Sequence, residues 1–95
     1  MNPIREFRFF SPLYGYDVVR LSIHDKRGAE HWCVVPLAVP PESPLAKLSY
    51  EKRKRIAKEA LTAHVEEIEE TNSPNSGEIY PFGLVVRPSK EARAT

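Results

Sequence analysis

The sequence is poor in cysteine and glycine and has no long apolar run. Its one cysteine, Cys33, cannot form an intramolecular disulfide, and its four isolated glycines form no glycine-rich phosphate loop. No apolar run approaches the roughly 18 residues that span a bilayer. The net charge of +1 gives no long-range field toward nucleic acid or a membrane surface. These absences argue against a disulfide-stapled domain, a membrane-spanning helix and phosphate-loop nucleotide chemistry.

The start of the chain and its length set the expected compartment and size. Residues 1–10, MNPIREFRFF, carry arginine and glutamate where a secretory signal needs an apolar stretch. We therefore expect a cytoplasmic protein, where a lone cysteine stays reduced. A length of 95 residues predicts one domain with one modest core. We place this domain at residues 1–88 and a polar tail at residues 89–95.

Alternating apolar and polar residues predict three strands in the first half of the chain. The first covers residues 5–10 and sets Phe7 and Phe9 on one side, where we expect them in the core. The second covers residues 17–24. Residues 25–28, DKRG, predict a four-residue hairpin loop because glycine takes the left-handed conformation that closes such loops. The third strand follows directly.

The register of this hairpin decides which side chains face the core. We expect the register that gathers the large apolar side chains on one face, which pairs His24 with Ala29, Leu21 with Trp32, and Val19 with Val34. The other face then carries Ser22, His31, Arg20 and Cys33. A slip of one residue reverses this assignment.

A stiff connector and one long helix follow. Residues 36–48 hold four of the nine prolines and fit neither a helix nor a central strand. Residues 49–70 predict a helix with Ser49 as its N-cap, or Ser43 before Pro44 if a short turn precedes it. Residues 71–77, TNSPNSG, end the helix. A last strand is predicted within residues 83–87.

The element order is strand, strand, strand, helix, strand, which predicts an α+β domain. A small antiparallel sheet covered on one face by the helix buries the apolar positions. This element order resembles that of the HicB-like antitoxins. The resemblance implies an antitoxin-type arrangement of the elements and rests on their order alone.

The predicted helix has an apolar stripe and a polar face. At 100° per residue, the stripe that should pack on the sheet contains Tyr50, Ala57, Ala60, Leu61, His64, Val65 and Ile68. The opposite side, here named the outer face, contains Lys52, Arg55, Glu59, Thr62, Glu66 and Glu70.

The charges of this helix oppose its dipole. Cations fill its first half, at Lys52, Arg53, Lys54, Arg55 and Lys58, and carboxylates fill its end, at Glu66, Glu67, Glu69 and Glu70. Two copies laid antiparallel bring each basic half against an acidic half, as a two-fold homodimer does. The alternatives are a solvated charged face and a separate charged partner.

Three other features are candidate sites. The basic helix start predicts nucleic-acid binding if Arg8, Arg20 and Arg27 share its surface and binding depends on salt. His64 is either a hydrogen-bonded core imidazole or a pH-sensitive contact. His31 and Cys33 share a strand face, but a zinc site needs more ligands, and cysteine catalysis needs an orienting group and an oxyanion site. We predict no metal, no cofactor and no enzyme.

The sequence therefore favours a small regulatory or accessory protein, of the kind that phages or mobile elements carry. We expect it to act by binding protein through the charged helix, as a homodimer, without a membrane. The alternative is a nucleic-acid-binding module that uses Lys52 to Arg55, and an enzyme centred on His31 and Cys33 is a third hypothesis.

Overall fold

The computed structural model describes residues 3–12, 16–72 and 77–82. Its helices and strands are, in chain order, β1 (Arg5–Ser11), β2 (Tyr16–His24), β3 (Glu30–Pro36), the 3₁₀ helix η1 (Pro44–Lys47), α1 (Tyr50–Thr71) and β4 (Gly77–Glu78). The predicted α+β class and element order are confirmed. The strand predicted within residues 83–87 and the polar tail at 89–95 lie outside the described residues.

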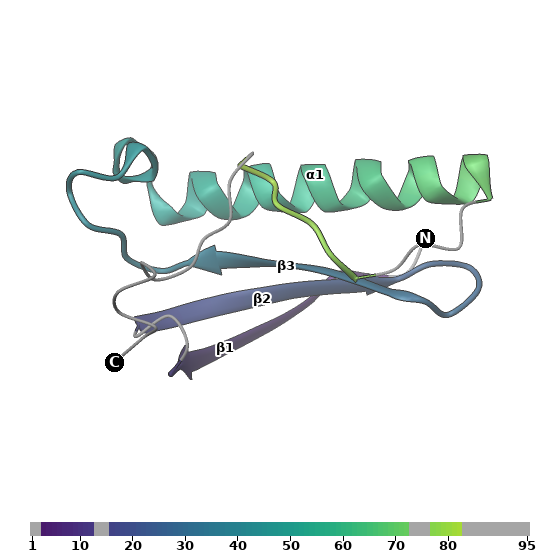
Figure 1. Ribbon diagram of the computed structural model, residues 1–95, viewed down its shortest axis with the longest axis horizontal. Helices are drawn as coiled ribbons and strands as arrows, with labels where there is room; N and C mark the ends of the chain where they lie inside the picture. Colours follow the sequence, from purple (N-terminus) through teal and green to yellow (C-terminus); the bar gives the residue numbers. More distant parts are fainter. Residues whose placement is uncertain (1–2, 13–15, 73–76, 83–95) are drawn as a thin grey trace, which may run out of the picture.

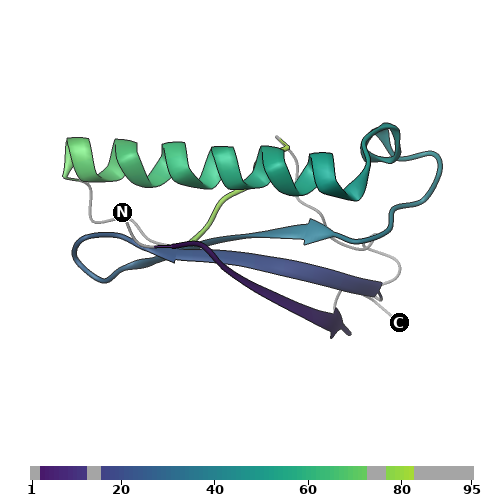
Figure 2. The same ribbon diagram turned by 180° about the vertical axis from the view of Figure 1, so that it is seen from behind.

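The fold has two layers, a four-stranded sheet in the order β1-β2-β3-β4 and α1 along one of its faces (Figure 1 and Figure 2). α1 packs over β2 and β3. The core between these layers contains Val19, Leu21, Ile23, Cys33 and Val35 of the sheet with Ala57, Leu61 and Val65 of the helix. Burying a side chain such as Leu61 contributes about 1.5 to 3 kcal/mol.

The predicted hairpin register is wrong by one residue. His24 pairs with Glu30, so Leu21 lies opposite Cys33 and not opposite Trp32. The cause is a loop of three residues between Asp25 and Ala29, in which Gly28 has φ +86° and donates to the Asp25 carbonyl at 3.0 Å. A type I turn followed by a left-handed glycine has this form.

The carboxylate of Asp25 stabilises the shorter loop. Its Oδ1 accepts the N–H groups of Arg27 at 2.9 Å and Ala29 at 3.0 Å. The one-residue shift sends His31 and Cys33 into the core, where both are fully buried, and sends Trp32 to the other face of the sheet.

The predicted antiparallel sheet is correct for β1, β2 and β3 only. β4 pairs parallel to β3, with Gly77 beside His31 and Glu78 beside Trp32, and the Ile79 N–H donates to the Trp32 carbonyl at 2.8 Å. The reason is the course of α1, which returns the chain to the beginning of β3 (Figure 1). A strand that starts there runs in the direction of β3.

Both predicted caps are present. The Ser49 hydroxyl accepts the Lys52 N–H at 3.2 Å and begins α1, while Ser43 caps η1 by accepting the Leu45 N–H at 3.2 Å. α1 ends at Asn72, whose φ of 57° is left-handed and whose N–H donates to the Ile68 carbonyl.

The apolar stripe of α1 is confirmed, with one addition. Ala57, Leu61, Val65 and Ile68 are buried, and Tyr50, Ala60 and His64 are half-buried. Arg53 is buried as well, with 4% of its surface exposed. Its position, three residues after Tyr50 and four before Ala57, places it on the same stripe.

Candidate functional site

The five cations at the start of α1 separate into three groups. Arg53 is buried. Lys54 and Lys58 point toward the sheet, where their Nζ atoms lie 3.1 and 2.7 Å from the two carboxylate oxygens of Glu6 on β1. Lys52 and Arg55 are exposed and have no ion pair or side-chain hydrogen bond within the described part of the chain. Only this last pair is fully available to a partner.

The buried guanidinium of Arg53 holds the connector in place. Its Nε donates to the Pro36 carbonyl at 3.2 Å, and its terminal nitrogens donate to the carbonyls of Leu37 at 2.9 Å, Leu45 at 3.3 Å and Leu48. These acceptors come from the end of β3 and from both ends of η1. Arg53 is therefore a structural residue, because its hydrogen-bond donors are directed into the fold.

Some of the α1 charges that oppose the helix dipole are paired within the chain. Hydrogen bonds from Lys58 and Lys54 hold the pKa of Glu6 below its ordinary value. At the other end of α1, the Glu69 carboxylate accepts the Lys26 backbone N–H of the hairpin loop at 2.9 Å. Glu66, Glu67 and Glu70 are exposed and have no such partner among the described residues.

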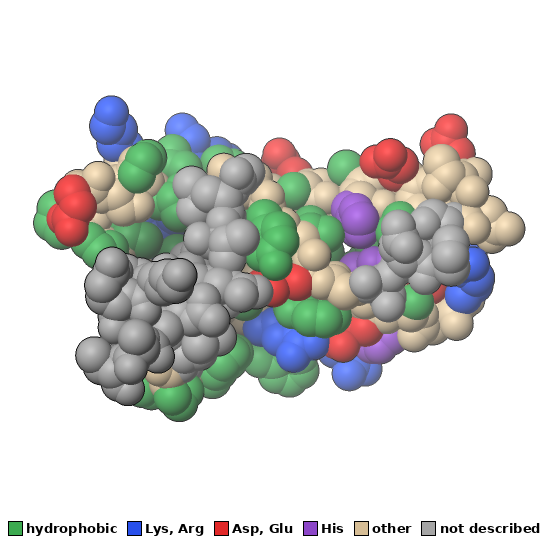
Figure 3. Space-filling view, viewed as in Figure 1, with side chains coloured by type: hydrophobic (Ala, Val, Ile, Leu, Met, Phe, Trp, Pro, Cys, Tyr) green, Lys and Arg blue, Asp and Glu red, His purple; other side chains and the backbone are tan. Residues whose placement is uncertain are grey.

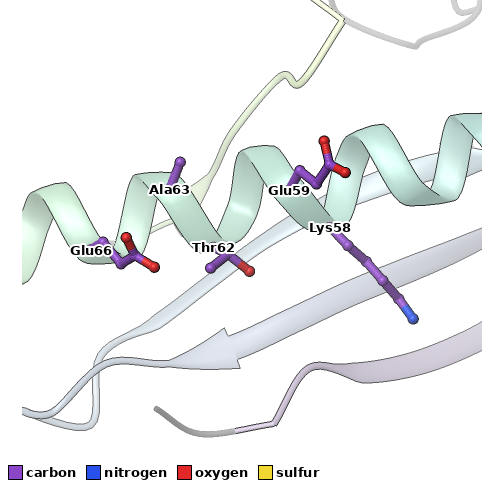
Figure 4. Close-up of a pocket in the computed structure, with 5 residues that line it drawn as sticks. All are labelled: Lys58, Glu59, Thr62, Ala63 and Glu66. Carbon is purple, nitrogen blue, oxygen red and sulfur yellow. The ribbon is translucent and has the colours of Figure 1, made fainter.

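The outer face of α1 therefore keeps two separate charged ends. Figure 3 shows Lys and Arg side chains over the first turns of α1 and Asp and Glu side chains over its last turns. Between them, a shallow hollow of about 350 Å³ is lined by Lys58, Glu59, Thr62, Ala63 and Glu66. Figure 4 shows the short side chains of Thr62 and Ala63 between the longer ones of Lys58, Glu59 and Glu66.

The arginines proposed to extend a nucleic-acid surface lie apart. Arg8 is on the helix-facing side of β1 and pairs with Asp17 at 3.3 Å. Arg20 lies on the opposite face of the sheet, 4.7 Å from the Trp32 ring centroid and 3.0 Å from a Glu30 oxygen. Arg27 is exposed in the hairpin loop. Arg8 and Arg20 thus do not form one surface.

A buried polar cluster lies between α1 and the hairpin, where histidine side chains are visible in Figure 3. His31 Nε2 lies 3.0 Å from Asp25 Oδ2, and the His64 ring meets the His31 ring edge-on at a centroid distance of 5.3 Å. The hydrogen bond from His31 and those from the loop amides lower the pKa of Asp25. Burial, with His31 as a second cause, lowers the pKa of His64.

This cluster has the orientation of a general base, but its His31 and Asp25 side chains are buried beneath a hollow of about 240 Å³ that Asp25 helps to line. The carboxylate of Asp25 can only accept, so Nε2 of His31 carries the proton and Nδ1 is left without a partner among the described residues. His31 and Asp25 are 0% and 2% exposed. Within the described ranges, no group of three or more His, Cys, Asp or Glu side chains is placed to hold a metal ion.

Cys33 is not a nucleophile in the folded protein. Burial, with the charge of Glu78 as a second cause, raises its pKa from 9.0 to about 12. This lowers the thiolate fraction about a thousandfold, and the thiolate is the reactive form.

We therefore expect iodoacetamide at pH 8 to alkylate Cys33 at least about a hundredfold more slowly in the native protein than in urea-unfolded protein. Mass spectrometry of timed samples measures both rates. Equal rates in the two states would contradict the buried position of the thiol.

The phenylalanines of β1 are not in the core, so this expectation was wrong. Phe7, Phe9 and Phe10 are 51%, 43% and 60% exposed. The alternation itself is as predicted, with Phe7 and Phe9 on the face of β1 turned away from α1. The helix and the hairpin complete the core without them, and no described helix or strand covers that face. The phenylalanines of residues 5–10, REFRFF, are plain in the sequence, but we predicted them on the core side of the sheet.

No family model, curated protein or solved structure matches this chain significantly. The resemblance of element order to the HicB-like antitoxins therefore stays a prediction. Within the described ranges, no helix combines the length and apolar composition that crossing a bilayer requires.

Proposed function

We propose that this protein is a non-enzymatic regulatory or accessory protein of the cytoplasm that acts by protein–protein binding and forms a homodimer through the outer face of α1. One observation carries the proposal. Lys52 and Arg55 at one end of this face, and Glu66 and Glu70 at the other, are exposed and have no intramolecular partner in the described part of the chain.

The spacing of these charges fits antiparallel pairing of two α1 helices. Suppose that the outer faces of the two helices meet at the height of residue 61 along the helix axis. Lys52 then lies opposite Glu70 of the second copy, and Arg55 lies opposite Glu66. Glu59 then comes beside Thr62 and Ala63 of the second copy, where short side chains form the hollow. Each contact occurs twice because a two-fold interface is isologous.

Nucleic-acid binding by the basic start of α1 has less support. Arg53 is buried, and Lys54 and Lys58 are already paired with Glu6. The two cations left on the outer face, Lys52 and Arg55, are fewer than a phosphate backbone usually requires.

Charge reversal tests the helix pairing. We expect the double variant Lys52→Glu/Arg55→Glu to weaken self-association through α1 at least about tenfold, because four attractive contacts become repulsive. The variant Glu66→Lys/Glu70→Lys should do the same. The measurement is solution mass by light scattering after size-exclusion chromatography, across protein concentration and salt.

Combining all four substitutions in one chain restores opposite charges at both ends and should restore the association. Lys47→Glu, which changes an exposed cation in η1, is the matched control and should leave the mass unchanged. If the quadruple variant associates no better than either double variant, helix pairing is wrong. Added salt should weaken the association because it screens exposed pairs.

A further inference from the structure

Among the described residues, the outer edge of β1 is unpaired, and β1 carries aromatic side chains. β1 pairs with β2 on one side, and within the described residues no strand pairs with its other side. Natural edge strands are usually protected by charged side chains, proline, a bulge or a covering element. β1 carries charges at Arg5, Glu6 and Arg8, but it also has three phenylalanines that are 43% to 60% exposed. An edge of this kind is suited to the addition of another strand.

We infer that β1 pairs antiparallel with β1 of a second copy, centred on Phe7. In this register, Phe7 lies opposite Phe7 of the second copy, Glu6 lies opposite Arg8, and Arg5 lies opposite Phe9. The charged pair and the cation–aromatic pair each occur twice about the two-fold axis. The sequence of β1 is thus complementary to a second, antiparallel copy of itself.

Neighbouring registers lack this complementarity. A pairing centred on Arg8 sets Arg8 against Arg8, and one centred on Glu6 sets Glu6 against Glu6, and like charges directly opposite are destabilising. A pairing centred on Phe9 places Phe7 opposite Ser11 and Arg8 opposite Phe10, and leaves Glu6 without a cation across the interface. Only the Phe7 register joins opposite charges and aromatic residues together.

The charged side chains of β1 are exposed enough to make these contacts. The Arg8 side chain is 70% exposed despite its pair with Asp17, so it is able to reach a second carboxylate. Glu6 is 38% exposed and already held by Lys54 and Lys58. Phe7 and Phe9 lie on the face that α1 does not cover. In the paired sheet, each Phe7 ring lies beside the Phe7 ring of the second copy, and each Phe9 ring lies beside Arg5. The two sheets become one, with both α1 helices on the same side.

This surface is distinct from the outer face of α1, so the two proposals succeed or fail separately. A chain with two different two-fold contacts assembles beyond a dimer. We therefore expect the wild-type protein at high concentration to exceed the mass of two 10.8 kDa chains.

Substitutions in β1 test the edge contact. Phe7→Lys places two lysines together on the two-fold axis, and Arg8→Glu sets a carboxylate against Glu6. Each should weaken the β1 contact at least about tenfold and lower the solution mass. Arg8→Glu changes an exposed side chain and therefore guards against loss of folding in Phe7→Lys, with circular dichroism as the check. Tyr80→Ser removes an exposed aromatic residue elsewhere and should leave the mass unchanged.

The outcomes separate the two surfaces. A wild-type assembly larger than a dimer that becomes a dimer with Arg8→Glu, and a monomer when Lys52→Glu/Arg55→Glu is added, supports both contacts. A wild-type dimer lost with Arg8→Glu but not with the α1 variant supports the edge contact and contradicts helix pairing. If Phe7→Lys and Arg8→Glu both keep the wild-type mass at every concentration, the β1 inference is overturned.

Discussion

Replacing Arg53 with methionine should destabilise the fold by about 3 kcal/mol, because four backbone carbonyl oxygens each lose a guanidinium donor at once. The four acceptors belong to Pro36, Leu37, Leu45 and Leu48, and no second cation lies on the same stripe to replace the guanidinium. Methionine fills the volume but donates nothing. The urea midpoint of unfolding, read by circular dichroism at constant slope, measures the loss.

Two further variants give this prediction its control. Arg55→Met removes the same charge from the same helix at an exposed position, and its effect should stay within about 0.5 kcal/mol. Arg53→Lys keeps the charge but not the planar array of donors, and should fall between the two. Equal midpoints for Arg53→Met and Arg55→Met would show that the carbonyl contacts contribute nothing measurable.

Stability should also fall as the pH drops below about 6.5, because the pKa of His64 is lowered in the folded protein. The unfolded chain then takes up a proton more readily than the folded one. The stability that His64 contributes is therefore complete above its unfolded pKa and is lost as the pH falls through the folded pKa. The pKa of Asp25 is lowered as well, so a second loss begins below about pH 4.

Urea midpoints measured between pH 8 and pH 5 separate the loss of stability due to His64 from that due to Asp25, because Asp25 stays ionised throughout this range. We expect the wild-type midpoint to decrease over this range and that of His64→Gln to change much less. A slope unchanged in His64→Gln would assign the pH dependence to another group.

The features that sequence reasoning predicted correctly depend on residues close together in the chain. Ser49 and Ser43 cap the helices they precede, and the periodic spacing of Ala57, Leu61 and Val65 defines the buried stripe. Each follows from local hydrogen bonding or helical geometry, so no knowledge of the tertiary structure was needed.

The errors depend on particular side-chain contacts and on how much of the sheet the helix covers. Asp25 shortens the hairpin loop through its own carboxylate, and this reverses the faces of Trp32 and Cys33. Arg53 is buried because the proline-rich connector presents four carbonyls to its guanidinium. The exposure of Phe7 depends on how much of the sheet a single helix covers. Composition and periodicity carry none of this information.

The candidate site was predictable only in outline. The opposite charges at the two ends of α1 are plain in the sequence, but the division of the cations into partnered and unpartnered groups depends on Glu6, which lies 48 and 52 positions before Lys54 and Lys58. The aromatic edge of β1 was visible as a composition and not as a surface. In both cases the sequence identifies the residue types, and the topology decides which of them meet solvent.

The short hairpin loop also limits how this chain tolerates insertions and deletions. Exposed turns usually accept them, but here one residue more or fewer between Asp25 and Ala29 turns Trp32 into the core and His31 out of it. A change of two residues preserves the faces. A loop grafted into this hairpin should therefore differ in length by an even number of residues, and its composition matters less. A change by an odd number of residues rearranges the packing beneath α1.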